Sequence, residues 1–293
     1  MKIAHITDIH FQTAPDPLRM GLGKRWLGSF NLYALGRRHE FALAVQQAVV
    51  ARLEALAPDL VLVSGDLTAQ AIPAEFALAR ATLAPVLDQV PTFVVAGNHD
   101  AYTRGAARTK RITATFGPWM GLGGPIARRD VGGVTVLGLD PNRPGVLSSG
   151  RVPDAELDGL RAALADPALA DRFVVLVVHY PLYGPTGKVY DNVSHGLVNA
   201  RAVLDVFDAA PKRPDLVVHG HKHHGYGSAH RCPDGQLVPI RNPGSSGQAH
   251  DDDHDRAASI GLYTVEAGQL VASTRERWTG HDFADAPWPG VTG

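Results

Sequence analysis

Side chains of the types that bind metal ions recur along this chain, each time after a short apolar run. They stand in five successive motifs: Asp8-Ile9-His10, Gly65-Asp66, Gly97-Asn98-His99-Asp100, His179 and Gly220-His221-Lys222-His223. One such motif alone carries little information, because histidines and aspartates often follow strands without binding anything. Five in succession favour a shared site. Their carboxylate, amide and imidazole donors suit Mn, Fe or Zn.

The number of candidate ligands exceeds what one tetrahedral or facial-triad site can use. The seven candidates are Asp8, His10, Asp66, Asn98, His179, His221 and His223. Two ions about 4 Å apart can share one carboxylate and hold a hydroxide between them. Such a pair lowers the pKa of bound water towards ~7 and stabilises both oxygens of an in-line displacement at phosphorus. The motifs therefore predict a dinuclear centre with two divalent or trivalent ions.

The apolar runs have strand length and are apolar on both faces, as in strands covered on both sides. We expect strands at residues 3–7, 60–64, 93–96, 134–138, 173–178 and 216–218, and later ones at 237–240, 260–265 and 270–273. Helical stripes lie between them, at 41–56, 76–86, 157–164 and 203–207. This alternation indicates βαβ units and a largely parallel sheet. Open α/β sheets bind ligands at the carboxyl ends of strands, where the five motifs fall.

Composition narrows the class of protein. The 293 residues are 45% hydrophobic and 19% charged, which favours one substantial folded core. Lys plus Arg is 28 and Asp plus Glu is 29, giving a net charge of −1, so we expect no nucleic-acid partner. A single cysteine excludes an internal disulfide framework and thiolate zinc sites. We expect one domain over residues 1–276, with a lid-like insertion at 11–38 and a C-terminal tail at 277–293.

The five motifs resemble those of the calcineurin-like metallophosphoesterases in type and order: D-I-H, G-D-L-T, G-N-H-D, a lone His after a strand, and G-H-K-H. The resemblance implies a four-layer α/β/β/α sandwich with a dinuclear site at its edge. It assigns one metal ion to Asp8, His10, Asp66 and His223. It assigns the second ion to Asp66, Asn98, His179 and His221, so that Asp66 bridges the two.

The resemblance also implies catalytic residues beside the ligands. His99 matches the family histidine that touches the substrate phosphate and stabilises or protonates the leaving oxygen. Asp100 follows it directly, and we expect its carboxylate to orient the His99 imidazole.

Within the family, the spacing resembles that of the cyclic-nucleotide and glycerophosphodiester phosphodiesterases. The nuclease branch carries D-W-H where this chain has Ile9, and the protein phosphatases carry an arginine that residues 67–70 lack. The tyrosine ligand of purple acid phosphatases has no counterpart. The resemblance implies a metal-dependent phosphoric ester hydrolase. Its substrate would be a small-molecule phosphodiester, cleaved by attack of a metal-bridging hydroxide.

Two basic segments begin beside the ligand motifs. The 11–38 insertion holds Arg19 and Arg25 among apolar residues, and Arg104 and Arg108 share a helical spacing after the G-N-H-D motif. Both segments predict a basic lid over a charged phosphate, with a solvated positive face as the alternative. Asn242 follows the last motif in a turn-forming stretch and is a further candidate for substrate contact.

Two other functions remain open from the sequence. The apolar residues from Trp26 to Leu35 would suit a pyrophosphohydrolase of a nucleotide-linked lipid, such as UDP-diacylglucosamine, in peripheral contact with a membrane. A non-catalytic scaffold with this fold is the second alternative, which the complete ligand set disfavours. No apolar run approaches the ~20 residues of a membrane span, and no signal peptide precedes the first strand, so we expect a cytoplasmic protein.

Overall fold

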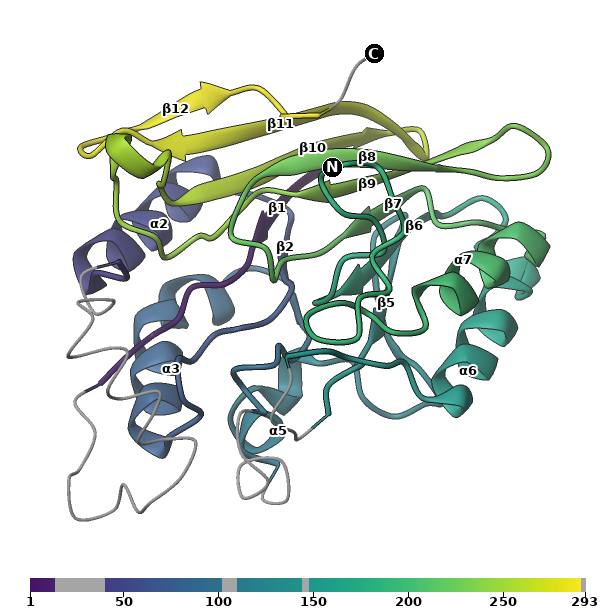
Figure 1. The fold of residues 1–293 in the computed structure, drawn as a ribbon, viewed down its shortest axis with the longest axis horizontal. Coiled ribbons are helices and arrows are strands. Elements are labelled where there is room, and N and C mark those ends of the chain that lie inside the picture. Colours follow the sequence, from purple (N-terminus) through teal and green to yellow (C-terminus); the bar gives the residue numbers. More distant parts are fainter. Residues whose placement is uncertain (14–39, 102–109, 144–147, 291–293) are drawn as a thin grey trace.

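Two six-stranded mixed sheets form the centre of the molecule (Figure 1). The computed structural model describes residues 1–13, 40–101, 110–143 and 148–290. The first sheet has the order β12-β11-β10-β1-β2-β3 and the second β4-β5-β6-β7-β9-β8. Strands β1, β2 and β3 are parallel, as are β5, β6, β7 and β9, while the remaining pairs are antiparallel.

The strands of the first sheet are β1 (Lys2–Ile6), β2 (Leu60–Val63), β3 (Thr92–Val94), β10 (Ser259–Glu266), β11 (Gln269–Trp278) and β12 (Phe283–Ala286). Those of the second are β4 (Ala127–Val131), β5 (Val134–Leu139), β6 (Phe173–Val178), β7 (Leu216–Val218), β8 (Tyr226–Arg231) and β9 (Leu237–Asn242). The helices are α2 (Leu43–Leu56), α3 (Pro73–Leu87), α5 (Arg111–Phe116), α6 (Asp154–Leu164) and α7 (Ala200–Ala209). Short 3₁₀ turns are η3 (Gly117–Trp119), η4 (Pro167–Leu169) and η5 (Asp252–His254).

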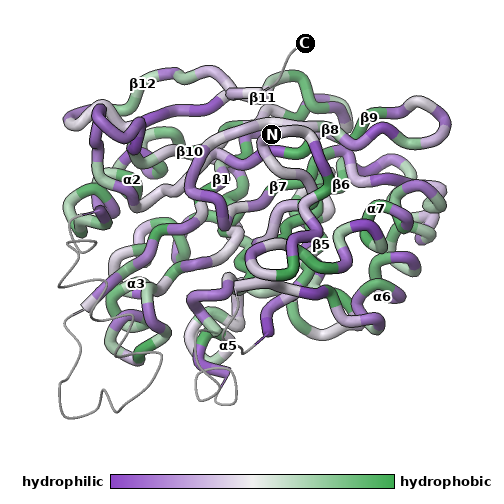
Figure 2. The backbone as a smooth tube through the Cα atoms, viewed as in Figure 1, coloured by the Kyte–Doolittle hydropathy of each residue, from purple (hydrophilic) through white to green (hydrophobic). Residues whose placement is uncertain are grey.

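Three apolar layers hold these elements together. The first lies between the outer face of the first sheet and helices α2, α3 and α5. The second lies between the second sheet and helices α6 and α7. The third fills the space between the two sheets. Figure 2 shows the hydrophobic residues on the central strands and alternating along the helices, as amphipathic helices against a doubly covered sheet require. The arrangement is the expected α/β/β/α sandwich.

The expected strands are present, but they belong to two sheets rather than to one largely parallel sheet. Three strands were not expected: β4, β8 and β12. Each lies at an edge of its sheet, and β4 and β12 have no buried residue. Edge strands meet solvent along one side and need no continuous apolar run, so the hydrophobic pattern does not reveal them.

Much of the expected C-terminal tail belongs to the first sheet. The expected boundary at residue 277 falls inside β11, and β12 adds an edge strand beyond it. Trp288 then stacks on Tyr263, with ring centroids 6.3 Å apart, and donates a hydrogen bond to Ser273 O at 3.0 Å. Among the described residues, no helix is both long enough and apolar enough to cross a membrane.

Candidate metal centre

The candidate ligands come together at the carboxyl ends of the parallel strands. Asp8 and His10 follow β1, Asp66 follows β2 and Asn98 follows β3. His179 follows β6, and His221 and His223 follow β7. The two parallel blocks end at one edge of the sandwich, so residues separated by more than 200 positions meet there.

The donors form two adjoining groups. In one, donor atoms of Asp8, His10 and His223 lie within 4.8 Å of one another, and in the other those of Asp66, His179 and His221 do. Asp66 also forms such a group with His10 and His99. Its Oδ2 atom lies 3.3 Å from His179 Nε2 and 3.9 Å from His10 Nε2. The carboxylate of Asp66 therefore lies between the two groups.

The Asn98 amide belongs with the second group. Its Oδ1 atom lies 2.8 Å from His221 Nδ1 and 3.0 Å from His179 Nε2. All seven predicted ligands are thus brought together.

Outward hydrogen bonds determine which imidazole nitrogens face the centre. His179 Nδ1 donates to Ser64 O at 2.8 Å, and His221 Nε2 donates to His195 O at 2.8 Å. A neutral imidazole with its proton on one nitrogen has a lone pair on the other. In the neutral His221 ring, Nδ1 therefore presents a lone pair to an oxygen lone pair of Asn98 Oδ1, an arrangement that a cation between them stabilises.

Asp8 supports the same conclusion for the first group. Its Oδ2 accepts hydrogen bonds from Thr7 Oγ1 and from His221 N, both at 2.8 Å. Its Oδ1 is buried with no hydrogen-bond partner and lies 3.3 Å from His223 Nε2. The His10 and His223 Nε2 atoms are themselves 3.0 Å apart. A buried carboxylate oxygen beside two imidazole nitrogens fits a divalent cation.

Charge in the cluster favours the ionisation states that metal binding requires. Burial alone would favour the neutral acids, but His223 holds the pKa of Asp8 well below its usual value, and His179 does the same for Asp66. Burial lowers the pKa of His221 to about 3 and keeps this imidazole neutral. His179 differs: against its burial, the Asp66 charge raises its pKa to about 9. A negative centre that holds a proton in this way also attracts a cation.

The backbone at the centre is held in an unusual conformation. Five of the seven predicted ligands have positive φ angles between 51° and 73°: Asp8, His10, Asp66, His221 and His223. Non-glycine residues in this region cost about 1–3 kcal/mol each and cluster at functional sites. Neighbouring glycines make room for the donors. A Cβ atom at Gly97 would overlap the Asp66 carboxylate, and one at Gly220 would overlap the Thr7 hydroxyl and the Asp8 carboxylate.

His99 borders the opening above the centre. Its backbone N–H donates to Asp66 Oδ1 at 2.7 Å, and its Nδ1 donates to Ala69 O at 2.7 Å. The expected role of Asp100 is wrong. The buried Asp100 carboxylate accepts hydrogen bonds from the backbone N–H groups of Leu67, Thr68 and Gly97 and from the Thr68 hydroxyl. It therefore joins the two ligand loops, and the Ala69 carbonyl orients the His99 ring instead.

The structure describes one of the five residues that we expected to contact substrate. Asn242 is fully buried, donates to Gly220 O at 3.3 Å and accepts from Gly244 N at 2.9 Å, so it supports the last ligand loop and cannot touch substrate. Arg19, Arg25, Arg104 and Arg108 lie outside the described residues, as do residues 14–38 of the predicted insertion. The Trp26–Leu35 segment that suggested a lipid substrate is among them.

The opening above the centre is a polar pocket of about 290 Å³. Besides predicted ligands and His99, its walls include Glu40, His195, Lys222, Gln248 and Arg256. Sequence reasoning missed most of these residues because they come from separate loops without a shared motif. The contribution of His195 is the clearest case, since its backbone carbonyl fixes His221 and a carbonyl carries no sequence signal.

The family model and the relatives that match this chain are described as phosphoesterases or phosphodiesterases. A family model described as calcineurin-like phosphoesterase matches residues 1–225. A probable cyclic nucleotide phosphodiesterase of Synechococcus sp. is 26% identical over 228 residues, covering 77% of this chain and 74% of the relative. A probable cyclic nucleotide phosphodiesterase of Rhodococcus erythropolis is 32% identical over 126 residues, covering 42% of this chain and 39% of the relative.

Solved structures share the fold. A dimetal phosphatase from Danio rerio superposes with a TM-score of 0.59 at 14% identity, covering 97% of this chain and 98% of that one. A purple acid phosphatase from yellow lupin seeds gives a TM-score of 0.54 at 13% identity, covering 94% of this chain and 53% of that one.

Proposed function

The chain belongs to the calcineurin-like phosphoesterase family, and from that membership we propose that this metal-dependent phosphoric ester hydrolase cleaves small-molecule phosphodiesters at the centre described above. We assign two ions to it, with Mn, Fe and Zn as the candidates that its donors accept. Asp8, His10, Asp66 and His223 would hold one ion. The second would be held by Asp66, Asn98, His179 and His221.

The position of Asp66 carries this proposal. Its carboxylate lies within 4 Å of an imidazole nitrogen from each donor group. A single-ion site would need no such shared carboxylate. Two bound ions would lower the pKa of a water molecule and neutralise charge that develops on the phosphoryl oxygens.

The chain's own residues would supply orientation and a proton. The Ala69 carbonyl holds His99 by its Nδ1–H, and in the cationic ring Nε2 carries a second proton. Because the ring borders the pocket, that proton is available to the leaving oxygen. The Asp66 carboxylate accepts from the His99 backbone, which couples the position of the acid to that of the bridging ligand. The Asp100 carboxylate accepts hydrogen bonds from backbone N–H groups of both loops, which keeps this geometry from relaxing.

The names of the relatives favour a phosphodiester, and the pocket favours an anionic phosphoester in general. Both curated relatives are named probable cyclic nucleotide phosphodiesterases. The pocket also presents cationic side chains that suit an anionic ester. Lys222 donates to Tyr190 OH at 2.8 Å, and Arg256 pairs with Glu40 at 3.0 Å.

The test combines metal analysis with a substrate screen. Protein loaded separately with Mn, Fe or Zn would be assayed on 2′,3′- and 3′,5′-cyclic nucleotides, glycerophosphodiesters, UDP-sugar lipids and monoesters. We expect two ions per chain and turnover of at least one diester. Asp66→Asn, with circular dichroism as the fold control, should lose bound metal and several orders of magnitude in kcat. Full metal occupancy without hydrolysis of any ester would contradict the proposal.

A further inference from the structure

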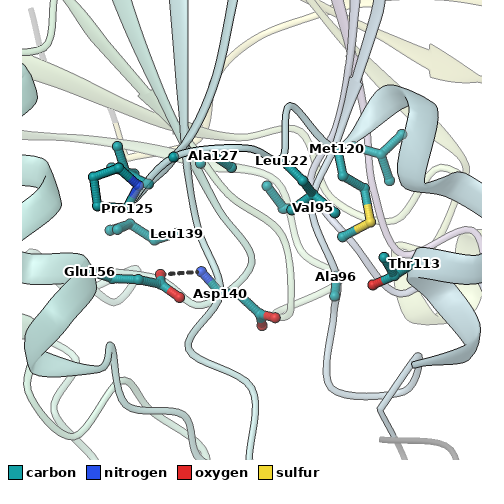
Figure 3. A pocket seen from close by; sticks show the side chains of 14 residues that line it. Val95, Ala96, Thr113, Met120, Leu122, Pro125, Ala127, Leu139, Asp140 and Glu156 are labelled. Atoms are coloured by element: carbon teal, nitrogen blue, oxygen red, sulfur yellow. Dashed lines mark hydrogen bonds between the residues drawn. The ribbon is translucent and has the colours of Figure 1, made fainter. Parts of the chain in front are cut away.

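A second cavity, of about 180 Å³, lies at the carboxyl ends of β3 and β5 (Figure 3). It occupies the open edge of the sandwich, where β3 and β5 end and where α6 and the segment after η3 approach each other. Val95, Met120, Leu122 and Leu139 give it apolar walls. None of the predicted ligands lines it, so it is separate from the polar pocket above the centre.

Two carboxyl groups interrupt the apolar lining. Glu156 Oε2 accepts a hydrogen bond from the backbone N–H of Asp140 at 2.8 Å. In Figure 3 the Asp140 carboxylate lies between Glu156 and Ala96. Burial, together with the charge of Asp140, raises the pKa of Glu156 to about 7. In the described part of the chain, no lysine or arginine pairs with either acid.

The cavity adjoins the proposed ligands through two connections. In the parallel pairing of β5 with β6, Leu139 lies opposite Val178, so Asp140 is the strand neighbour of His179, with strands about 4.8 Å apart. Ala96 is two residues before Asn98, a Cα separation of at most about 7 Å. Asn142 Nδ2 ties the two sides together, donating to Asp140 Oδ1 at 2.7 Å and to Ala96 O at 2.8 Å. Residues that line the cavity are therefore chain or strand neighbours of the predicted ligands Asn98 and His179.

We propose that this cavity binds the nitrogen-bearing part of the substrate, an amino group on a small ring or short alkyl stem. The stem would contact Met120, Leu122 and Leu139, and the N–H groups would donate to Asp140 and Glu156. Carboxylates accept such hydrogen bonds strongly, whereas they repel a second phosphate or a carboxylate. The inference rests on the proposed phosphodiesterase function and specifies the substrate class of that site.

Two sources would supply this chemistry, the exocyclic amine of a nucleobase and the ammonium group of an alkyl ester. Matched substrate pairs separate them. The first pair is 2′,3′-cyclic AMP and the 2′,3′-cyclic phosphate of purine riboside, which lacks the amino group. The second is glycerophosphoethanolamine and the n-propyl ester of glycerophosphate. We expect kcat/KM to favour the amino member of at least one pair by roughly tenfold or more.

Variants test whether the two acids cause that preference. Asp140→Asn and Glu156→Gln retain oxygens that can accept the hydrogen bonds now made, but they remove the charges. Each variant should bring the ratio of kcat/KM for the amino substrate to kcat/KM for its amine-free partner towards one. Asp158→Asn is the matched control, because Asp158 lies on α6 two residues from Glu156 and pairs with Arg161 at the surface. It should leave the ratio unchanged.

Equilibrium binding gives a readout independent of turnover. Calorimetry with AMP and purine riboside monophosphate, and with phosphoethanolamine and propyl phosphate, should show the same preference and its loss in the two variants. Hydrolysis of bis(4-nitrophenyl) phosphate reports separately on the proposed function. If that ester is cleaved but neither pair is discriminated, or if both variants keep the wild-type ratios, the cavity assignment is wrong and the phosphodiesterase proposal stands.

Discussion

We propose His99 as the acid, and its position is fixed from two sides. Its ring is held through Nδ1 by the Ala69 carbonyl, and its backbone is fixed to Asp66. A side chain that protonates a leaving oxygen contributes about 10²–10⁴-fold to rate. We expect His99→Gln to lower kcat by that range for esters with alkoxide leaving groups and by much less for 4-nitrophenyl esters. The latter need little protonation because their leaving group is a weak base.

Measurement of kcat for both ester classes, with metal content determined on the same samples, checks this prediction. His195→Gln is a useful comparison, because the backbone carbonyl that fixes His221 is retained in this variant. Equal losses for both leaving groups in His99→Gln would assign the ring to phosphate binding instead.

We expect His179 to make metal binding depend on pH. In the metal-free protein burial acts to lower its pKa, but the Asp66 charge outweighs this and raises the pKa to about 9. The Nε2 proton must therefore leave before a cation binds at pH 7.5. Metal affinity should rise from pH 7 to 9 and then level off. The pKa values of Glu75 and Glu156 are raised to about 7, at the lower end of this pH range.

Calorimetry in buffers of different ionisation enthalpy would count the released proton, with about one expected at pH 7.5. The stability of the metal-free fold depends on pH in the opposite direction. A histidine whose pKa is raised in the folded state stabilises the fold below pH ~6.5 and loses that contribution as the pH rises through about 9. An affinity that is constant between pH 7 and 9 would show that His179 is already neutral.

The candidate metal ligands were predictable from the sequence, but the groups that form hydrogen bonds with the site residues were not. The motifs identify Asp8, Asp66 and His221 by residue type and by their order in the sequence. The Ala69 and His195 carbonyls, which orient His99 and His221, leave no trace in residue type. Asp100 shows the same limit, since only the folded loops reveal that its carboxylate is consumed by backbone N–H groups.

At the scale of elements, the loops after the strands carry the strain of the centre, and Gly97 shows how closely they pack. A Cβ atom there would overlap the Asp66 carboxylate and backbone. We expect Gly97→Ala to displace Asp66, lower bound metal below two ions per chain and reduce kcat at least a hundredfold. Gly133→Ala is the control, because nothing lies within 4 Å of its Cβ position. Metal stoichiometry by mass spectrometry measures the effect, and unchanged metal content in Gly97→Ala would contradict it.

Strand position in the sheet explains which elements the sequence reveals. Strands β5 and β6 are buried throughout, and their apolar runs identify them. Strand β4 holds Arg128, Arg129 and Asp130, whose polar side chains suit an edge but resemble a loop. The packing of two sheets against each other has no local sequence pattern, unlike the alternation of strands and helices along the chain. The sandwich was therefore predicted from the family resemblance alone.

At the scale of the molecule, a layer shared by both sheets links the halves of the chain. Ile3, Leu62 and Tyr263 from the first sheet pack with Val175 and Val218 from the second. Because both sheets contribute side chains to this layer, one sheet cannot unfold without disrupting the layer that the other sheet shares. We therefore propose that the described part of the chain unfolds as one domain, with no separate tail after residue 276.

Trp288 provides the sharpest test of that proposal, because it lies beyond the expected domain boundary. Its ring stacks on Tyr263 and lies 5.6 Å from the Arg241 guanidinium, so it spans both sheets. We expect Trp288→Ala to lower the free energy of unfolding by about 1–3 kcal/mol. Leu237→Ala, at a side chain 50% exposed, should change it by less than about 0.5 kcal/mol. A separate tail would leave the Tm of Trp288→Ala at the wild-type value, whereas a single domain shifts the far-UV and tryptophan-fluorescence transitions together.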